Sequence, residues 1–342
     1  MSRRWRVAGA AALAVVLVAA LLLGARAWRS AHRGDLERAL DFAPKDAQRY
    51  SWTDWAAVRR AVGTSSESAL LSKGYDEDLT AGSSLTDSTD VLRRSFGISL
   101  ARLDWELYAQ STSGAVVIVK VPGSFGSIRH HLTAAGFTPP STPSGVWDGS
   151  SVDVGAVPEL QYVALDESDH LMLTSDNDSY LRQTVDRLGH GSLPGPVGDV
   201  AGKLGTPLSA EIYGGDYTCE KLAMSQADPA DAAQGGQLIA AAGKVNPVLA
   251  FAMARSARSS GRPGDVTVAM AFADHGQAVT NADTRATLAT GPAPGQGGTF
   301  RDRFTLGKVA ASGSVVTMDL HPKPGAYVLS DLSTGPLLFA TC

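Results

Sequence analysis

The stretch Ala115-Val116-Val117-Ile118-Val119-Lys120-Val121 is the strongest structural signal in this chain. An almost unbroken β-branched run is typical of a buried strand. Pro122-Gly123 breaks the run, and apolar residues then recur at helical spacing from Phe125 until Gly136. Further strands are expected at 146–154, 160–165 and 170–174, followed by a helix that ends at Gly189. The order is therefore strand, helix, strands, helix.

The same order recurs after a stretch rich in Gly and Pro at 189–198. In this second part we expect strands at 208–213, 248–254, 266–273, 304–310, 314–320 and 326–331, with 337–340 as an additional strand, and helices at 229–243 and 276–289. The pattern predicts an α+β fold, with a mostly antiparallel sheet and helices packed on one face. It also predicts two related β-α-β-β-α units that meet near residue 200.

The first 34 residues form a membrane-targeting segment. An apolar run from Val7 to Ala25 is flanked by Arg residues on both sides and contains 19 residues. About 20 residues span a bilayer as a helix, whereas a signal-peptide core has roughly 7–15. We therefore expect a single-pass transmembrane anchor that contacts the lipid bilayer through residues 7–25, with the body outside the cytoplasm. Secretion after cleavage following Ala27 is one alternative, and a reverse anchor with a cytoplasmic body is another.

The remaining chain is acidic. The leader contains six of the 30 basic residues and none of the 34 acidic ones. The rest of the chain therefore has 24 basic against 34 acidic residues, a net charge of −10. This charge argues against a nucleic-acid partner. We expect four segments: the anchor at 1–34, a membrane-proximal and mainly helical and loop segment at 35–110, a first α+β unit at 111–200 and a second at 201–342.

Two cysteines, Cys219 and Cys342, are present. In an exported protein such a pair is expected to form a disulfide, with two buried thiols as the alternative. We expect the bridge to hold the C-terminal strand, which would otherwise fray.

A compact signature occurs at Arg49-Tyr50-Ser51-Trp52-Thr53-Asp54-Trp55. Ser51 or Thr53 is expected to cap a helix that ends at Gly63. Together with the anchor and the late cysteine pair, this stretch resembles uncharacterised actinobacterial envelope proteins that have one N-terminal membrane segment. The resemblance implies a location in the cell envelope and no particular activity.

The common catalytic and metal-binding motifs are missing from the sequence. Neither Gly-x-Ser-x-Gly nor Ser-x-x-Lys occurs, so the corresponding serine enzymes are disfavoured. His130-His131 is a poor zinc chelate, because adjacent helical residues point about 100° apart. Asp176-Asn177-Asp178 lacks the Gly and Glu of a calcium loop and is expected to begin a helix, with Ser175 or Asp176 as its cap. Asp76-Glu77-Asp78 is expected in a solvated loop, and Gly123-Ser124-Phe125-Gly126 in a tight turn.

We therefore assign no catalytic residue, no cofactor and no metal. The sequence favours a non-enzymatic, membrane-tethered ectodomain that binds an envelope protein or glycan or acts as a scaffold. An alternative is a hydrolase of cell-wall glycans that uses paired carboxylates. Its candidate residues are Asp104, Glu106, Asp148 and Asp153, beside Trp105 and Trp147.

Overall fold

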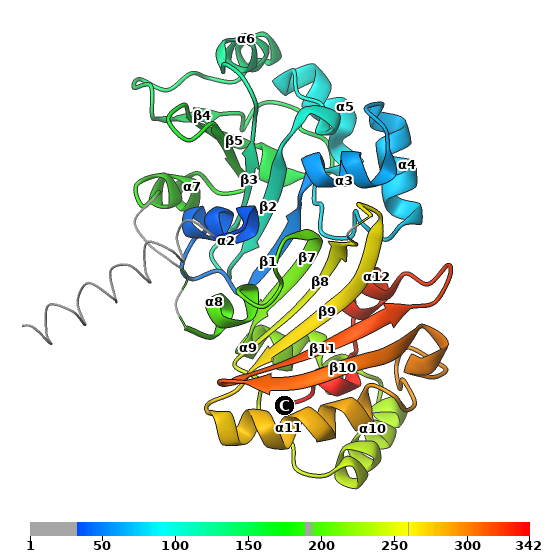
Figure 1. Cartoon of the computed structure of the whole chain (residues 1–342). Helices are drawn as coiled ribbons and strands as arrows, with labels where there is room; N and C mark the ends of the chain where they lie inside the picture. Colours follow the sequence, from blue (N-terminus) through cyan, green and yellow to red (C-terminus); the bar gives the residue numbers. More distant parts are fainter. Residues whose placement is uncertain (1–32, 189–192, 194, 259) are drawn as a thin grey trace, which may run out of the picture.

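Eleven strands pair in one antiparallel sheet that runs through the whole body of the molecule (Figure 1). The computed structural model describes residues 33–188, 193, 195–258 and 260–342. The strands follow the order β10-β11-β9-β8-β7-β1-β2-β3-β6-β5-β4 across the sheet. Their bounds are β1 Arg49–Thr53, β2 Trp105–Gln110, β3 Ala115–Lys120, β4 Val146–Asp148, β5 Tyr162–Asp166, β6 Leu171–Ser175, β7 Pro207–Gly214, β8 Ala250–Ala257, β9 Pro263–Ala271, β10 Phe304–Ser312 and β11 Val315–Pro322.

Helices cover both faces of this sheet, so the expectation that they pack on one face is wrong. The α-helices are α2 Asp35–Ala39, α3 Trp55–Val62, α4 Glu67–Asp76, α5 Thr89–Val91, α6 Gly126–Ala135, α7 Asp178–Val185, α8 Gly195–Ala201, α9 Gly215–Tyr217, α10 Pro229–Ala242, α11 His275–Leu288 and α12 Val328–Ser333. The first face, which carries Trp52 and Leu107, packs against α2, α7 and α8. The second face packs against α3, α4 and α6 in one half and α11 and α12 in the other.

The two halves of the sheet share one order of strands about the central pair β1 and β7. In each half three consecutive strands lie side by side, namely β1–β3 or β7–β9, and a helix, α6 or α11, then crosses the second face. The chain next forms the edge strand, β4 or β10, and only afterwards the strand that pairs with the third one, β6 or β11. One row of paired residues crosses the whole sheet at the same level. From β1 outward this row contains Ser51, Tyr108, Val117, Thr174, Val163 and Trp147, and from β7 outward Glu211, Met253, Val268, Met318 and Val309.

Strand β1 replaces the helix start that was expected at residues 51–53. Its side chains alternate between the faces, so that Tyr50 and Trp52 are buried in the first face. The helix begins only at Trp55, where the Asp54 side chain accepts a hydrogen bond from the Ala57 amide. Gly63 ends it in the left-handed conformation with φ of 65°, as expected. Because β1 and β2 both belong to the 35–110 segment, the sheet continues through every described segment.

The C-terminal region departs most from expectation. The stretch 326–331 begins helix α12 and is not a strand, and residues Leu338–Ala340 form a 3-10 turn. The strand expected at 146–154 is confined to β4. The disulfide between Cys219 and Cys342 is present, with a Cα–Cα distance of 5.7 Å. It therefore fastens a C-terminal turn to the π-helical turn Thr218–Leu222 rather than holding a strand.

The expected membrane anchor at residues 7–25 and the cleavage position after Ala27 lie outside the described residues. Within the described ranges, no helix has the length and apolar character needed to cross a bilayer.

Candidate ligand cleft

An open cleft of about 650 Å³ lies where three separate parts of the chain meet. One wall is the end of α3 and the end of α4, which belong to the insert between β1 and β2. The opposite walls are the hairpin between β8 and β9 and the loop that joins β11 to α12. The cleft therefore draws residues from both halves of the sheet.

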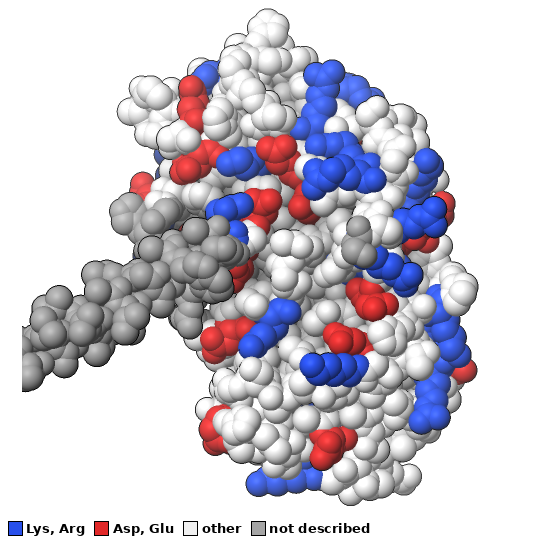
Figure 2. Space-filling view, viewed as in Figure 1, with Lys and Arg blue, Asp and Glu red and all other residues white. Residues whose placement is uncertain are grey.

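The cleft is basic, although the body of the protein is acidic. Its charged lining consists of five basic residues and two acidic ones, namely Lys73, Arg255, Arg258, Arg262 and Lys323 against Asp76 and Glu77. Figure 2 shows basic side chains along the side of the molecule that carries α3 and α4. A basic concavity raises the local concentration of anions. The charge of the cleft therefore favours an anionic ligand.

Several of these basic groups are available to a ligand. Arg262 and Lys323 are exposed, and their side chains have no hydrogen bond or ion pair within the described part of the chain. Arg258 lies 3.9 Å from Asp265, at the outer limit of an ion pair. Surface ion pairs of this kind contribute little stability, so an anion that binds Arg258 in place of Asp265 would cost little free energy.

Arg255 is the one charged residue of the cleft lining that is buried. It stands on β8 in the same phase as Phe251 and Met253, so its side chain leaves the second face of the sheet. It forms an ion pair with Asp78, with 3.8 Å between Nη1 and Oδ2. Both Nε and Nη1 are buried without a hydrogen bond. Burial lowers the pKa of Arg255, and Asp78 opposes this effect.

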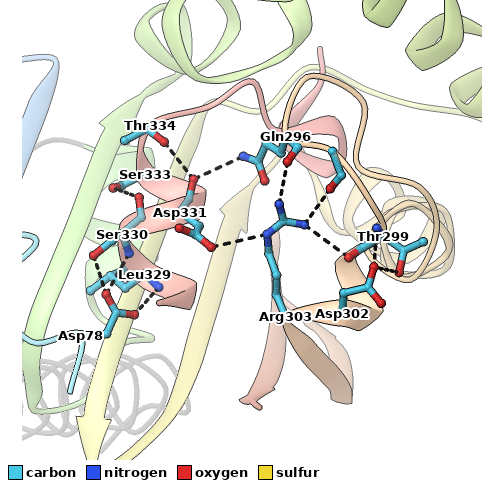
Figure 3. Close-up of polar contacts among 11 residues, drawn as sticks. Asp78, Gln296, Thr299, Asp302, Arg303, Leu329, Ser330, Asp331, Ser333 and Thr334 are labelled. Carbon is cyan, nitrogen blue, oxygen red and sulfur yellow. Dashed lines mark hydrogen bonds and ion pairs between the residues drawn. The ribbon is translucent and has the colours of Figure 1, made fainter. Parts of the chain in front are cut away.

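Asp78 accepts no hydrogen bond from Arg255, and its oxygens instead accept hydrogen bonds from the first residues of α12. Its carboxylate accepts hydrogen bonds from the Leu329 amide at 2.6 Å, the Ser330 amide at 3.1 Å and the Ser330 hydroxyl at 2.5 Å (Figure 3). Burial raises the pKa of Asp78, and the hydrogen bonds from Ser330 and Leu329 lower it. Asp78 thus ties the first insert to the last helix, and it is buried rather than lying in a solvated loop.

Helix α12 is held from its other side by Arg303. The Arg303 guanidinium lies 3.5 Å from the Asp331 carboxylate and donates hydrogen bonds to the carbonyls of Gln296, Gly297 and Thr299 (Figure 3). The cleft wall formed by residues 322–326 therefore leads into a helix that is fixed at two points.

A seam of buried polar side chains crosses the second face of the sheet and separates its two apolar clusters. It contains Ser51 and Thr53 on β1, Ser209, Glu211 and Tyr213 on β7, Glu106 on β2 and Arg255 on β8, and the partly exposed Arg49 lies at its end. Glu106 accepts hydrogen bonds from Trp55, Ser83 and Ser84. Burial raises the pKa of Glu106. These carboxylates lie beneath the helices and do not line the cleft.

Glu211 is the most perturbed acid of this seam. Burial raises its pKa to about 7, although Arg49 and the Ser51 hydroxyl act in the opposite direction. Ser51 donates to Oε2 at 2.7 Å and Tyr213 at 3.3 Å, while Oε1 has no hydrogen bond. Glu211 is thus about half protonated at neutral pH, where an ordinary Glu would be ionised.

The four acids considered for a glycan hydrolase are not brought together. Asp104 and Glu106 belong to the start of β2, whereas Asp148 and Asp153 lie at or beyond β4. Four strand spacings separate β2 from β4, or about 19 Å. Glycosidase carboxyl pairs need roughly 5–9.5 Å. Trp105 and Trp147 are buried in the core on opposite faces, so neither forms a sugar platform.

The other motifs have structural roles. The rings of His130 and His131 lie 6.0 Å apart on α6, and no cluster of three metal-ligating side chains occurs among the described residues. Asn177, not Ser175 or Asp176, caps α7 through the Tyr180 amide, and the Asp176 carboxylate accepts a hydrogen bond from the Ala115 amide. Gly123 adopts a positive φ of 96°, as the expected turn requires.

Sequence reasoning missed Arg255, which lines the cleft, and Asp78, its buried partner behind the lining. Arg255 did leave a signal, because it places a charge in the apolar phase of a buried strand. Asp78 left none, since its partners are about 250 residues away in sequence. Comparison with known proteins adds no constraint: no protein-family model and no curated protein matches this chain.

Proposed function

We propose that this protein is a membrane-tethered ectodomain of the cell envelope that binds a partner in the basic cleft and catalyses no reaction there. The observation that carries the proposal is the cleft itself. Its chemistry is charge recognition, because Arg and Lys dominate the charged part of its lining while the perturbed carboxyls of Glu106 and Glu211 lie buried elsewhere. A preformed concavity of this size is typical of a ligand site.

Two features support the location. The disulfide between Cys219 and Cys342 is suited to an oxidising compartment outside the cytoplasm. The apolar run at residues 7–25, flanked by Arg, provides the tether in this proposal. We also infer that the two halves of the sheet are related units, on the basis of their common strand order and register.

The location is tested with reporter fusions. A phosphatase that is active only outside the cytoplasm, fused after Cys342, is expected to be active in intact cells. A reporter that works only in the cytoplasm, fused at the same position, serves as the matched control and is expected to be silent. Activity of the cytoplasmic reporter alone would overturn the proposed location.

Binding in the cleft is tested by site-specific crosslinking in intact cells. A photoreactive amino acid at Arg262 is expected to capture a partner reproducibly. The same amino acid at Gln237, an exposed position on α10 that does not line the cleft, is the control. Equal adducts at both positions, or none at Arg262, would contradict a binding function for the cleft.

A further inference from the structure

The buried guanidinium of Arg255 lacks the acceptors that its environment should provide. A guanidinium has five N–H donors, and leaving buried donors unpaired is unfavourable. Its side chain is 10% exposed, it lines the cleft, and its distance of 3.8 Å to Asp78 is too long for a hydrogen bond. Arg255 is therefore a fixed cation at the bottom of the cleft whose donors remain to be satisfied.

Asp78 does not satisfy these donors in the structure. Its two oxygens accept three hydrogen bonds from the first residues of α12, and a carboxylate can accept about four. It can therefore take at most about one further bond, which leaves most of the Arg255 donors to another acceptor. Asp78 thus balances the charge of Arg255, while the N–H donors of Arg255 stay free for another acceptor.

Two tyrosines that are next in sequence to lining residues form an aromatic pair, although neither lines the cleft itself. Tyr75 on α4 lies next to Asp76, and Tyr327 lies next to Ala326, two residues that line the cleft. Their ring centroids are 5.3 Å apart, and Tyr75 is 64% exposed. An exposed tyrosine offers a flat apolar surface with a polar tip, on which a sugar ring can pack.

From this combination we infer that the cleft binds an anionic glycan, that is, sugar units bearing phosphate or carboxylate groups. Arg255 receives one acidic group at the bottom of the cleft, while Arg262 and Lys323 contact others near the surface. Tyr75 packs against a sugar ring at the rim. Arginine suits this role, because its planar donor fork matches both carboxylate and phosphate oxygens. The inference rests on the proposed binding function and names the ligand class for the same cleft.

The test uses the full chain in nanodiscs of uncharged lipid and four labelled probes. Dextran phosphate, carboxymethyl-dextran and neutral dextran share one sugar backbone, and polyphosphate has the charge without the sugar. We expect both acidic dextrans to bind and neutral dextran not to bind. We expect polyphosphate to bind about tenfold more weakly than dextran phosphate. Binding of neutral dextran, or equal binding of polyphosphate and dextran phosphate, would overturn an anionic glycan as the ligand.

Variants assign the binding to the cleft. The double variant Arg262→Gln, Lys323→Gln is expected to bind dextran phosphate about tenfold more weakly. The matched control Arg301→Gln, Lys308→Gln removes the same charge from exposed positions outside the cleft lining and is expected to bind normally. Equal losses in the two double variants would show that the affinity comes from net charge and would overturn the site.

Two single variants examine the bottom and the rim. Arg255→Lys keeps the charge but loses the planar fork, so weaker binding of dextran phosphate with an unchanged melting temperature is expected. Tyr75→Ala, at an exposed position, is expected to weaken the binding of dextran phosphate and to leave the binding of polyphosphate unchanged. Unchanged dextran phosphate binding in both variants would overturn the inference. If a protein is crosslinked at Arg262, the proposed binding function of the cleft is supported, but an anionic glycan as its ligand is rejected.

Discussion

At the scale of single residues, the buried carboxyl of Glu211 makes stability depend on pH. Its pKa is about 7 in the folded protein against an ordinary value of 4.5, mainly because of burial. The folded state therefore holds this proton more tightly than the unfolded chain does. This contribution to stability is complete below pH 4.5 and is lost as the pH rises through 7.

Glu211→Gln is expected to remove this loss. Relative to the wild type, the variant should gain on the order of 3 kcal/mol in free energy of unfolding between pH 4.5 and pH 8, the difference between a pKa of 4.5 and one of about 7. Denaturant unfolding at a series of pH values measures it. Glu220→Gln, at an exposed position, is the matched control and should run parallel to the wild type. If Glu211→Gln also runs parallel to it, the carboxyl titrates normally.

Arg285 shows how a buried cation can be satisfied without an acid. Its guanidinium donates to the carbonyls of Asn246, Phe339 and Thr341, and Nε donates to the Asn281 side chain. Burial lowers its pKa to about 10. The contrast with Arg255 is informative, because two arginines in similar burial differ in whether the protein supplies the acceptors.

At the scale of elements, the C-terminal turn is held by two independent fastenings. The disulfide joins it to the turn after β7, and Arg285 on α11 binds the carbonyls of Phe339 and Thr341. Phe339 itself packs edge-on against Phe300 with centroids 5.2 Å apart. A short turn without strand pairing is thus fixed by one covalent bond and by buried contacts.

Replacing Cys219 and Cys342 together with Ser is expected to lower the free energy of unfolding by roughly 2–5 kcal/mol, because the bridge closes a long loop in the unfolded chain. Amide exchange should stay slow at Ala340 and Thr341, whose amides donate to the Leu337 and Leu338 carbonyls, since Arg285 still holds this turn. Arg285→Met in the oxidised protein is the comparison, and there exchange at these amides should accelerate. Fast exchange in the double Ser variant would show that the disulfide alone holds the turn.

Elements with local stop signals were predictable from the sequence. Helices α6 and α10 end at Gly136 and Gly243 as expected, because a C-terminal glycine cap depends only on the residues of the helix end itself. Strand β1 was not predictable, because its state depends on pairing with β2 and β7, and its Trp-Thr-Asp-Trp stretch also fits a helix start. Helix α12 escaped prediction for the same reason, since its cap comes from Asp78. The cleft is built from such distant partners, so only the unusual phase of Arg255 indicated it.

At the scale of the whole molecule, the sheet makes the two halves depend on each other. Strand β1 pairs with β7 over five residues of each strand, from Arg49 with Tyr213 to Thr53 with Ser209. Separating the halves would expose the backbone groups of both strands and the polar seam around Glu211. An exposed central strand is an aggregation site rather than a stable edge.

We therefore expect residues 33–188 and 195–342 not to fold when each is produced alone. Each should aggregate or lack a cooperative thermal transition, whereas the full chain should unfold in one transition by calorimetry and by circular dichroism. The two fragments produced together should recover a soluble complex. A cooperative transition in either fragment alone would show that the halves are independent domains.

The meeting of β1 and β7 also has a consequence in time. Ser51 and Glu211 are 160 residues apart in sequence. Because synthesis begins at the N-terminus, β1 leaves the ribosome long before β7 has been made. The hairpin of β2 and β3 can form early, while one side of β1 waits without a neighbour. Pairing across so long a loop is slow, because the loop must close before any contact compensates for its entropy. The middle of the finished sheet thus cannot form until β7 emerges, and until then the unpaired side of β1 is where a chaperone would be needed.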